Sequence, residues 1–349
     1  MPDPLPLGKL PFDLLASLLD RAPIKDPRVL YGPGIGLDCA VIDLGERVLV
    51  FKTDPITFAT EDIGWYAVQI NANDIATTGA TPRWMLATLL LPENATRQSQ
   101  VEAIFDQIYR AAAVLDISVV GGHTEVTYDL HRPILVGTLI GEVTRDRLVT
   151  PTQVRPGDRL LLTKGVPVEG TALLAREYPQ RLARVMDAAE LKEAQEFLYR
   201  PGISVVRDAQ IAAQAGQVHA MHDPTEGGLA GALWELSVAS HAHLVVDPRA
   251  VIVPDLSRRV CAEFGLDPLA TIASGALVIA VEAGDAGTVR AALEQNGIPC
   301  SEIGRVDEGA PGVWQVSGAP LQRPARDDIA RVYEDHPPAA EQRQSRLPE

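Results

Sequence analysis

The sequence has few cysteines, no long apolar run and a shortage of basic side chains, and each shortage excludes a class of protein. Its 349 residues include only 3 cysteines, Cys39, Cys261 and Cys300, which are far apart. Neither a disulfide framework nor a zinc knuckle is therefore indicated. No apolar run approaches the roughly 18 residues that a membrane-spanning helix needs. Lysine and arginine total 31 against 46 acids, a net charge of −15, which argues against a nucleic-acid partner.

The N-terminal segment also lacks the features of a secretory signal. It reads MPDPLPLGKLPFDLLASLLD, with acids and prolines where a signal has a basic stretch followed by a continuous apolar one. We therefore expect a cytoplasmic protein. Hydrophobic residues make up 46% of the chain and charged residues 22%, which is ordinary for a globular protein. The length allows two domains of roughly 150 residues each.

The first half predicts an α/β (α+β) domain with its helices on one face of a sheet. Residues 39–44 and 48–51 are typical of a hairpin that leads to Thr53-Asp54-Pro55. A helical pattern then begins at Asp62 and ends before Pro82. The remaining elements are expected to be a strand over 84–91, a helix over 101–115, and strands over 117–120 and 134–140. The predicted order is therefore ββαβαββ.

A turn-rich segment around 150–158 predicts the boundary between two domains. The second half is again α/β. Its strands are expected near 160–163, 244–246, 276–281, 301–306 and 313–316 and just before His222, and its helices near 170–177, 188–198, 203–215, 227–239 and 286–295. The expected divisions are an N-terminal extension over 1–30, domains over 31–150 and 151–335, and an unpacked tail over 336–349.

Asp74 is the acid whose position most needs an explanation. Ile63, Ala67 and Ile70 precede it at steps of four, three and four residues, so it falls on the apolar face of the predicted helix. A carboxylate buried there costs several kcal/mol unless a cation or a set of donors compensates it. The alternative is that Asp74 caps a neighbouring loop through backbone N–H groups.

Three further acids, Asp38, Asp54 and Asp223, come at strand or hairpin ends beside Gly, Pro or Thr. Such ends are where α/β proteins expose catalytic side chains. Aspartate is also the commonest turn residue, so turn formation stays open for each of the three. Together with Asp74 they form a set of hard oxygen ligands suited to Mg²⁺, which prefers carboxylates and substrate phosphates. We expect the four acids to lie in a single cleft.

Glycines near these acids are candidates for phosphate binding. Gly227-Gly228 follows Asp223-Pro224-Thr225 and opens a predicted helix, so its N–H groups can face an anion. Thr225 and Asp223 are equally suited to be N-caps. Gly34 and Gly36 form a second loop that can cover phosphates. The chain contains neither a P-loop motif nor a Rossmann motif.

The segment Gly121-Gly122-His123-Thr124-Glu125 is expected to leave its strand and turn abruptly. His123 can then serve as a base, a ligand or a donor to a phosphate oxygen, or its ring can be satisfied structurally. Lys52, Lys164 and Arg132 are candidates for neutralising phosphate charge.

The order of these motifs resembles a known superfamily. LDCAV, TDP, NDIATTGATP, GGHTEV, GDRLLLTKG, HDPTEGGLAGALWELS and ASGALVIAV with IGRV follow one another from about residue 34 to 306. The order is similar to that of aminoimidazole ribonucleotide (AIR) synthetase, selenophosphate synthetase, thiamine-monophosphate kinase and the hydrogenase maturation protein HypE. The resemblance implies a two-domain AIR synthase-like fold whose N-terminal domain forms a shared β-barrel in a homodimer. It also implies that ATP and Mg²⁺ are used to phosphorylate a substrate oxygen.

Carried over motif by motif, the resemblance also implies roles for single residues. Asp38, Asp54, Asp74 and Asp223 correspond to carboxylates that bind metal and nucleotide, Asn73 accompanies Asp74, and His123 matches a position that the family fills with His, Asp or Glu. In the mechanism that we expect, Asp223 or His123 assists proton transfer. The residues expected to contact the nucleotide are Gly34, Gly36, Lys52, Asp54, Asn73, Gly121, Gly122, Thr225, Gly227 and Gly228.

Within the superfamily, HDPTEGG is most similar to the DPTRGG segment of HypE, with Glu226 where HypE usually has arginine. HypE carries its substrate on a C-terminal cysteine, and the last residues here, SRLPE, contain none. The leading hypothesis is HypE-like phosphoryl transfer to an oxygen of an unassigned small molecule or carrier group. A non-catalytic nucleotide-binding scaffold that docks a maturation partner is the alternative. A third hypothesis is a nucleotide-free metal hydrolase that uses Asp54, Asp74 and His123.

Overall fold

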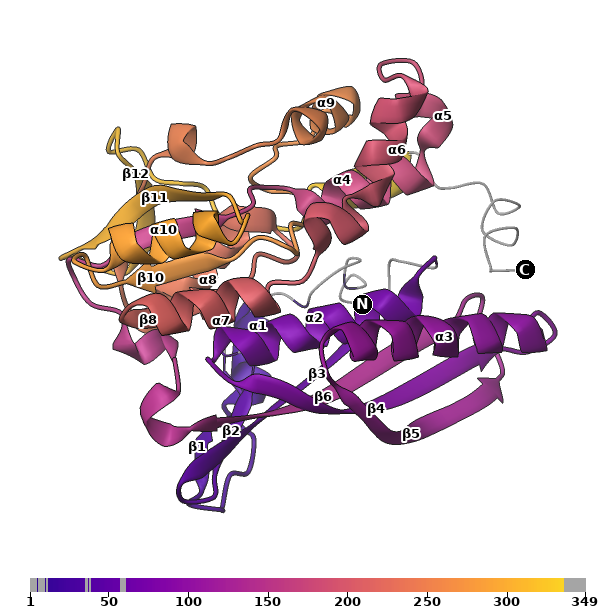
Figure 1. Cartoon of the computed structure of the whole chain (residues 1–349), viewed down its shortest axis with the longest axis horizontal. Helices are drawn as coiled ribbons and strands as arrows, with labels where there is room; N and C mark the ends of the chain where they lie inside the picture. The colour runs from indigo at the N-terminus through magenta and orange to yellow at the C-terminus, as the bar shows by residue number, and fades with distance from the viewer. Residues whose placement is uncertain are drawn as a thin grey trace. The chain divides into compact units, whose positions relative to one another are not determined.

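The computed structural model describes residues 5, 10, 12–34, 37, 39–56 and 61–335. The chain divides into two compact units, which Figure 1 shows in one view. We call them the N-terminal domain, with described residues 27–31 and 39–148, and the C-terminal domain, with described residues 5, 10, 12–26, 32–34, 37 and 149–335. The tail expected over 336–349 lies outside the described residues. No helix in the described part of the chain is long and apolar enough to cross a membrane.

The described residues of the N-terminal domain form a six-stranded sheet and two helices. The elements are β1 (Val29–Tyr31), β2 (Ala40–Asp43), β3 (Arg47–Ile56), α2 (Ile63–Thr77), β4 (Thr81–Pro92), α3 (Gln98–Val114), β5 (Ser118–Thr127) and β6 (Ile134–Thr144). The strand order is β1-β2-β3-β6-β4-β5, and only the pair β4 and β5 is parallel. The predicted order ββαβαββ is confirmed, with β1 added. Figure 1 shows α2 and α3 along one face of the sheet.

This sheet is open in a single copy of the chain. Among the described residues, β1 and β5 lie at its two edges and do not pair with each other. The barrel that the resemblance implies is therefore not formed by one chain alone, and it stays a prediction about two.

Helix α2 is buried on all sides, whereas the predicted apolar stripe was narrow. Of its 15 residues 14 are buried, because it contacts α3 as well as strands β3, β4 and β6. Small residues permit this close packing. A Cβ on Gly64 would lie 2.6 Å from the carbonyl oxygen of Ile104 on α3, and a Cβ on Gly141 of β6 would lie 2.2 Å from Cγ2 of Ile75.

Two segments expected at turns lie inside strands. Asp54 is within β3, where it pairs with Gly137 of β6. The segment Gly121–Glu125 continues β5 in parallel register with β4, so the abrupt turn expected there is wrong. A Cβ on Gly122 would lie 1.9 Å from the carbonyl oxygen of Ala87. The glycine therefore permits close approach of the neighbouring strand and does not mark a turn.

The C-terminal domain has a second six-stranded sheet with helices around it. The elements are α1 (Phe12–Leu19), β7 (Arg159–Thr163), α4 (Val168–Glu177), α5 (Pro179–Leu182), α6 (Ala188–Glu196), α7 (Val206–Ala215), β8 (Val218–His222), α8 (Gly228–Ser240), β9 (His243–Val246), α9 (Asp255–Phe264), β10 (Val278–Val281), α10 (Ala286–Gln295), β11 (Cys300–Asp307), β12 (Gly312–Gln315) and α11 (Ile329–Asp335). The strand order is β12-β9-β11-β7-β10-β8. The sequence analysis missed α1, α5, α9 and α11.

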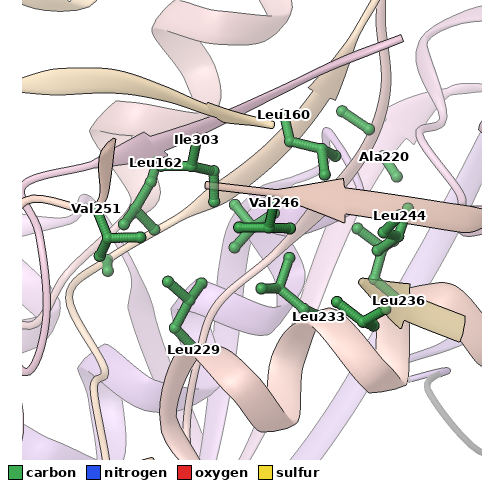
Figure 2. Close-up of a cluster of buried hydrophobic side chains, with 14 of the residues drawn as sticks. Leu160, Leu162, Ala220, Leu229, Leu233, Leu236, Leu244, Val246, Val251 and Ile303 are labelled. Atoms are coloured by element: carbon green, nitrogen blue, oxygen red, sulfur yellow. The ribbon is translucent and has the colours of Figure 1, made fainter. Parts of the chain in front are cut away.

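The core of this domain lies between α8 and the sheet. Leu229, Leu233 and Leu236 on α8 pack against apolar side chains of β7 and β9 (Figure 2). Side chains alternate along a strand, so Leu161 of β7 points to the opposite face, where it is equally buried. Helix α10 contacts β7 and β11. Helix α8 thereby holds the loop before it, which carries the predicted site residues, against the ends of the strands.

Candidate functional site

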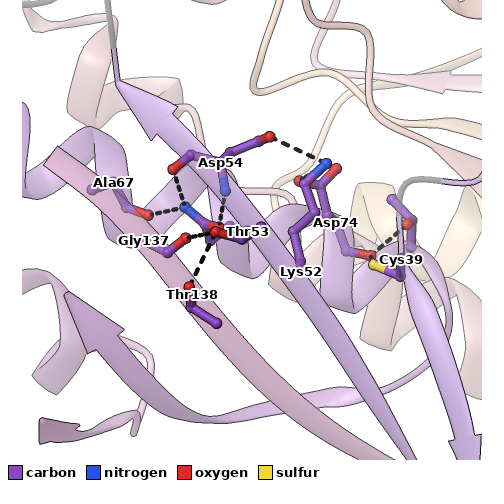
Figure 3. A network of polar contacts seen from close by, with 10 residues as sticks. Cys39, Lys52, Thr53, Asp54, Ala67, Asp74, Gly137 and Thr138 are labelled. Atoms are coloured by element: carbon purple, nitrogen blue, oxygen red, sulfur yellow. Dashed lines mark hydrogen bonds and ion pairs between the residues drawn. The ribbon is translucent and has the colours of Figure 1, made fainter. Parts of the chain in front are cut away.

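One lysine joins two of the predicted acids in the N-terminal domain. Lys52 Nζ lies 3.2 Å from Asp54 Oδ2 and 3.2 Å from Asp74 Oδ2, as Figure 3 shows. Lys52 and Asp54 are two residues apart on β3, so their side chains point to the same face of the sheet. Asp74 reaches them from α2, which contacts β3. Two separately predicted elements thus bring three charged groups together.

The burial of these groups differs. The side chain of Asp74 is 5% exposed, that of Lys52 12% and that of Asp54 36%. The buried carboxylate therefore has the cationic partner that its position predicted, and that cation is a lysine of the chain itself. Two carboxylates face one ammonium, and Asp54 is the member most open to solvent. Hard oxygen donors with more negative than positive charge fit Mg²⁺ by donor chemistry.

Asn71, which the sequence analysis missed, holds the backbone beside this cluster. The Asp54 N–H donates to Asn71 Oδ1 at 3.0 Å, and Asn71 Nδ2 donates to the Ala67 carbonyl at 2.8 Å. A Cβ on Gly137 would lie 2.4 Å from Asn71 Nδ2, so glycine leaves room for the amide. An amide three residues before a buried acid on the same helix is the signal that points to Asn71.

Further polar contacts fix the helix end of the cluster. Cys39 Sγ donates to the carbonyl oxygen of Asp74 at 3.3 Å, and Thr77 Oγ1 donates to the same oxygen at 2.7 Å. Cys39 is 7% exposed, so its thiol is a small buried side chain. Asn73 is fully buried beside Asp74 on α2, and its contact with the nucleotide stays a prediction.

Asp38 and Gly36 lie outside the described residues, so their roles stay predictions. Gly34 is described, and it forms an isolated antiparallel bridge with Leu37. Its predicted role at the phosphates likewise stays a prediction.

His123 lies apart from the lysine cluster. It stands on edge strand β5, with its side chain 64% exposed and its Nε2 2.9 Å from Glu125 Oε2. Strands β6 and β4 separate β5 from β3, which places the two strands about 14 Å apart at the usual spacing. One metal ion cannot take ligands from His123 and Asp54 of the same chain, so the hydrolase site expected on these residues is not formed within one chain. A cavity of about 400 Å³ lies beside β5, lined by Gly121, Gly122 and His123 together with Phe105 and Tyr109 of α3.

In the C-terminal domain, Asp223 follows β8 and is 1% exposed. Gly227 and Gly228 have φ values of +84° and +59°, in the left-handed region that favours glycine. A Cβ on Gly228 would also lie 2.6 Å from the Thr271 carbonyl oxygen. The backbone conformation and the close packing at this turn therefore explain the two glycines without a bound phosphate.

A carboxylate of the chain occupies the start of α8. The Gly227 N–H donates to Asp327 Oδ2 at 2.7 Å, and Asp327 Oδ1 accepts from the Ile329 N–H at 2.8 Å. The N–H group expected to face a phosphate thus donates to Asp327. Neither Asp223 nor Thr225 is the N-cap of α8, because the cap is Gly227 and it has no side-chain bond.

Two acids near this helix start, the buried Glu169 and the half-buried Asp327, have raised pKa values. Burial, together with the negative charge of Glu226, raises the pKa of Glu169 to about 8 and that of Asp327 to about 6. The sequence analysis missed Glu169 and Asp327, because nothing local marks either one as buried. We call Glu169, Glu226 and Asp327 the acidic cluster.

Lys164 is a buried structural residue, so its expected role in neutralising phosphate is wrong. Its Nζ lies 3.1 Å from Asp208 Oδ2 and donates to the Ser204 carbonyl at 2.5 Å. Burial lowers the pKa of this ammonium group. Arg132 is exposed before β6, and its role stays a prediction.

A second group of potential metal ligands already holds a cation of the chain. The ligand atoms of Asp158, His219 and Glu282 lie within 4.8 Å of one another. Arg155 Nη2 lies 3.0 Å from His219 Nε2 and 2.5 Å from Glu282 Oε2. The guanidinium group thus balances the two carboxylates.

Comparison with known proteins places this fold in a family. Models of the AIR synthase related protein family match residues 36–143 for the N-terminal domain and 155–316 for the C-terminal domain. A hydrogenase expression/formation protein of Methanocaldococcus jannaschii is 30% identical over 264 residues, which are 72% of this chain and 75% of that protein. Carbamoyl dehydratase HypE of Cupriavidus necator is 30% identical over 275 residues, 74% of this chain and 73% of that protein. Thiamine-monophosphate kinase of Escherichia coli O157:H7 is 26% identical over 318 residues, 86% of this chain and 92% of that protein.

Solved structures show the same fold. The crystal structure of the hydrogenase maturation protein HypE in complex with ATP matches with a TM-score of 0.65 and 24% identity, over 89% of this chain and 91% of that one. The structure of a HypE–HypF complex matches with a TM-score of 0.66 and 21% identity, over 81% of this chain and 93% of that one.

Proposed function

The chain belongs to the AIR synthase-related protein family, and on that premise we propose that it is an ATP-dependent enzyme of the HypE-like type. The proposed reaction is phosphoryl transfer from ATP to an oxygen of a small molecule or carrier group. Its acceptor is unassigned. The single observation that carries the proposal is the contact of Lys52 with both Asp54 and Asp74.

The activities named for the relatives support this reaction type. One relative is a carbamoyl dehydratase, another is a kinase of a phosphate ester, and a HypE structure contains ATP. Phosphorylation of an oxygen is the end point of a kinase reaction. It also turns a poor leaving group into a good one, which is what dehydration requires.

The lysine cluster has the chemistry that a metal–nucleotide site needs. Mg²⁺, when bound, bridges phosphate oxygens and offsets the charge that develops during transfer. Asp54 and Asp74 would hold it, and Lys52 fixes the two carboxylates against each other. Asn71 orients the backbone of Asp54 through its N–H group. The cluster is therefore preorganised by the fold, which lowers the cost of ordering it on binding.

The remaining predicted residues keep their roles as part of the proposal. Asp38 and Asp223 are further metal ligands, and Asp223 or His123 assists proton transfer. The residues Gly34, Gly36, Asn73, Gly121, Gly122, Thr225, Gly227 and Gly228 position the nucleotide. The N–H group of Gly227 already donates to Asp327. In this proposal Gly227 therefore shapes the backbone around the nucleotide and does not donate a hydrogen bond to it.

We also propose a homodimer that forms through the edge of the N-terminal sheet. Val120 and Val126 on β5 and Tyr128 after it are 56%, 58% and 79% exposed. An edge strand presents unpaired backbone groups to another chain, and exposed apolar patches mark interaction sites.

The double variant Val120→Lys, Val126→Lys should be a monomer where the wild type is a dimer, as the molar mass from light scattering would show. The exposed Val185 of the other domain, changed to lysine, is the matched control. A wild-type protein that is monomeric at every concentration would contradict the proposal.

Binding of a non-hydrolysable ATP analogue tests the function. Calorimetry should show binding with Mg²⁺ that weakens at least tenfold in EDTA, because the protein and the nucleotide are both strongly negative. Asp74→Asn should remove most of the Mg²⁺-dependent gain, and Asp106→Asn on the exposed face of α3 should leave it intact. Equal affinity with Mg²⁺ and with EDTA would overturn the proposal.

The alternative, a nucleotide-binding scaffold that docks a maturation partner, is favoured by the solved HypE–HypF complex. Turnover separates the two functions. Steady ATP hydrolysis by the wild type that disappears in Asp74→Asn excludes the scaffold, whereas nucleotide binding without any hydrolysis favours it.

A further inference from the structure

Glu169 is a buried acid with no cation among the charged groups that act on it. It lies in the first turn of α4 and is 7% exposed. Its Oε2 has no hydrogen-bond partner among the described residues. Leaving a buried acceptor unsatisfied costs about 1 to 3 kcal/mol. Such an atom is uncommon in folded proteins and calls for an explanation.

The surroundings of Glu169 are negative and polar. The charged side chains that act most strongly on it are Glu226 and Asp327, both acids. Ser274 adjoins it, and the side chain and backbone of Ser274 both act to lower the pKa of Glu169. By distance and angle, however, neither Glu169 Oε2 nor Ser274 Oγ completes a hydrogen bond. Two adjoining buried polar atoms therefore lack partners at one place.

The other two acids of the cluster, Glu226 and Asp327, are open to solvent in part, and Asp327 is held in position by hydrogen bonds. Glu226 and Asp327 are half-buried, so the cluster is not sealed from solvent. Asp327 is tied to the N–H groups of Gly227 and Ile329, which fixes one wall of the cluster. These bonds explain the position of Asp327, but they leave Glu169 unexplained.

The spacing of the acids argues against a metal ion. Among the described residues, three potential ligand atoms come within 4.8 Å of one another only at Asp158, His219 and Glu282. Glu169, Glu226 and Asp327 are too widely spaced for all three to coordinate one ion. An ammonium or amidinium group carries several N–H donors that point in different directions, so it can satisfy carboxylates spaced more widely.

We propose that the acidic cluster of Glu169, Glu226 and Asp327 is a binding site for a cationic nitrogen group, a protonated amine or an amidinium, on the acceptor. If this ligand is the acceptor of the proposed reaction, the acceptor carries a cationic nitrogen group. The identification of the ligand as the acceptor rests on the proposed function, whereas the binding site itself does not. Glu169 receives an N–H of the ligand at Oε2, and Glu226 adds negative charge nearby. A neutral or anionic acceptor gains nothing from this site.

Binding must depend on pH, because the ligand prefers the ionised carboxylate. Burial and the neighbouring acids Glu226 and Asp327 raise the pKa of Glu169 to about 8, so the empty site is largely protonated at pH 7. The cation therefore displaces a proton from Glu169. Its affinity should rise about fivefold between pH 7 and pH 8 and level off above pH 9.

The test uses the full-length chain without nucleotide and with methylguanidinium as the probe, followed by ligand-observed NMR at constant ionic strength. Methylguanidinium and methylammonium should bind, with the rise in affinity given above, whereas neutral N-methylurea should not. Glu169→Gln should weaken methylguanidinium binding at least tenfold at pH 8 and flatten its pH profile. The exposed Glu308→Gln is the matched control and should behave as the wild type.

Infrared difference spectra give a second readout. Adding methylguanidinium at pH 7 should remove the C=O band of a protonated carboxyl group, and this loss should be absent in Glu169→Gln. Equal binding of N-methylurea, equal binding by Glu169→Gln, or a response to Mg²⁺ alone would each overturn the proposal. Because no arm uses ATP, failure here is distinguishable from failure of the proposed phosphoryl transfer, which calorimetry with the nucleotide tests.

Discussion

The two domains each bury a carboxylate beside predicted site residues, and they compensate it in different ways. In the N-terminal domain, Asp74 on α2 is matched by the ammonium group of Lys52. In the C-terminal domain, Glu169 on α4 has only acids as charged neighbours of strong influence, and its pKa is raised to about 8. The first carboxylate has a cation beside it, whereas burial favours the protonated form of the second. The comparison teaches that buried acids of similar exposure differ in charge state according to their partners.

Removal of Lys52 should have the largest effect on stability. Lys52→Met leaves the carboxylate of Asp74 buried without this cation, which should cost about 3 to 5 kcal/mol of unfolding free energy. The double variant Lys52→Met, Asp74→Asn should recover much of the loss, because the orphaned charge is gone. Urea unfolding at pH 7 measures all of these proteins. If Lys52→Met lowers the unfolding free energy by only about 0 to 1 kcal/mol, as the loss of an exposed ion pair does, Lys52 does not compensate the charge of Asp74.

The pH dependence of stability should separate the second carboxylate from the first. Glu169 has an ordinary pKa of 4.5 and a folded value of about 8, so the folded state binds the proton more tightly than the unfolded state. The stability from this proton is complete below pH 4.5 and is lost as pH rises toward 8, at about 1.4 kcal/mol per unit. Asp327, with a folded pKa of about 6, adds a loss of the same sign between pH 3.8 and 6.

Glu169→Gln should reduce this decline, because its neutral amide does not titrate. Unfolding free energies at intervals from pH 5 to pH 9 provide the measurement, with Glu308→Gln as the control. A decline of equal slope in Glu169→Gln and in the wild type would contradict the assignment.

The packing of Asn71 against Gly137 should show a smaller and coupled effect. Gly137→Ala places a Cβ 2.4 Å from Asn71 Nδ2, and it should cost about 1 to 3 kcal/mol. In an Asn71→Ala background most of that cost should vanish, since the amide is the group that clashes. A double-mutant cycle in urea measures the coupling. Purely additive effects would mean that the glycine serves another contact.

The exposed pair of His123 and Glu125 should contribute least. Both side chains are about half or more exposed, at 64% and 49%, and exposed ion pairs contribute about 0 to 1 kcal/mol. His123→Ala should therefore leave the unfolding midpoint nearly unchanged. If His123→Ala lowers the unfolding free energy as much as Lys52→Met does, solvent exposure does not determine how much an ion pair contributes to the stability of this protein.

The sequence predicted the order of elements in the N-terminal domain because periodicity is local. The spacing of Ile63, Ala67, Ile70 and Asp74 indicated a helix with a buried acid, and α2 confirms it. Local turn signals were less reliable. The glycines at 121 and 122 and the Asp54-Pro55 pair read as turns, yet they lie inside strands. At Gly122 the reason is that the backbone of the neighbouring strand comes close.

The charged partners were beyond the reach of the sequence. Lys164 was one of three candidates for neutralising phosphate charge, but it is buried against Asp208, 44 positions further along the chain. Asp327 reaches Gly227 across 100 positions. Neither pairing leaves a periodic trace, since each depends on where two distant segments meet.

By itself, the sequence determined which segments form helices and strands in the first domain and that one acid would be buried on a helix. Only the tertiary structure decided that Lys52 reaches Asp74, that Asp327 accepts from the Gly227 N–H, and that the Oε2 atom of Glu169 has no hydrogen-bond partner among the described residues. The physical reason is that secondary structure follows from neighbours along the chain. The ionisation of a buried group follows from the charges and donors that folding brings near it in space.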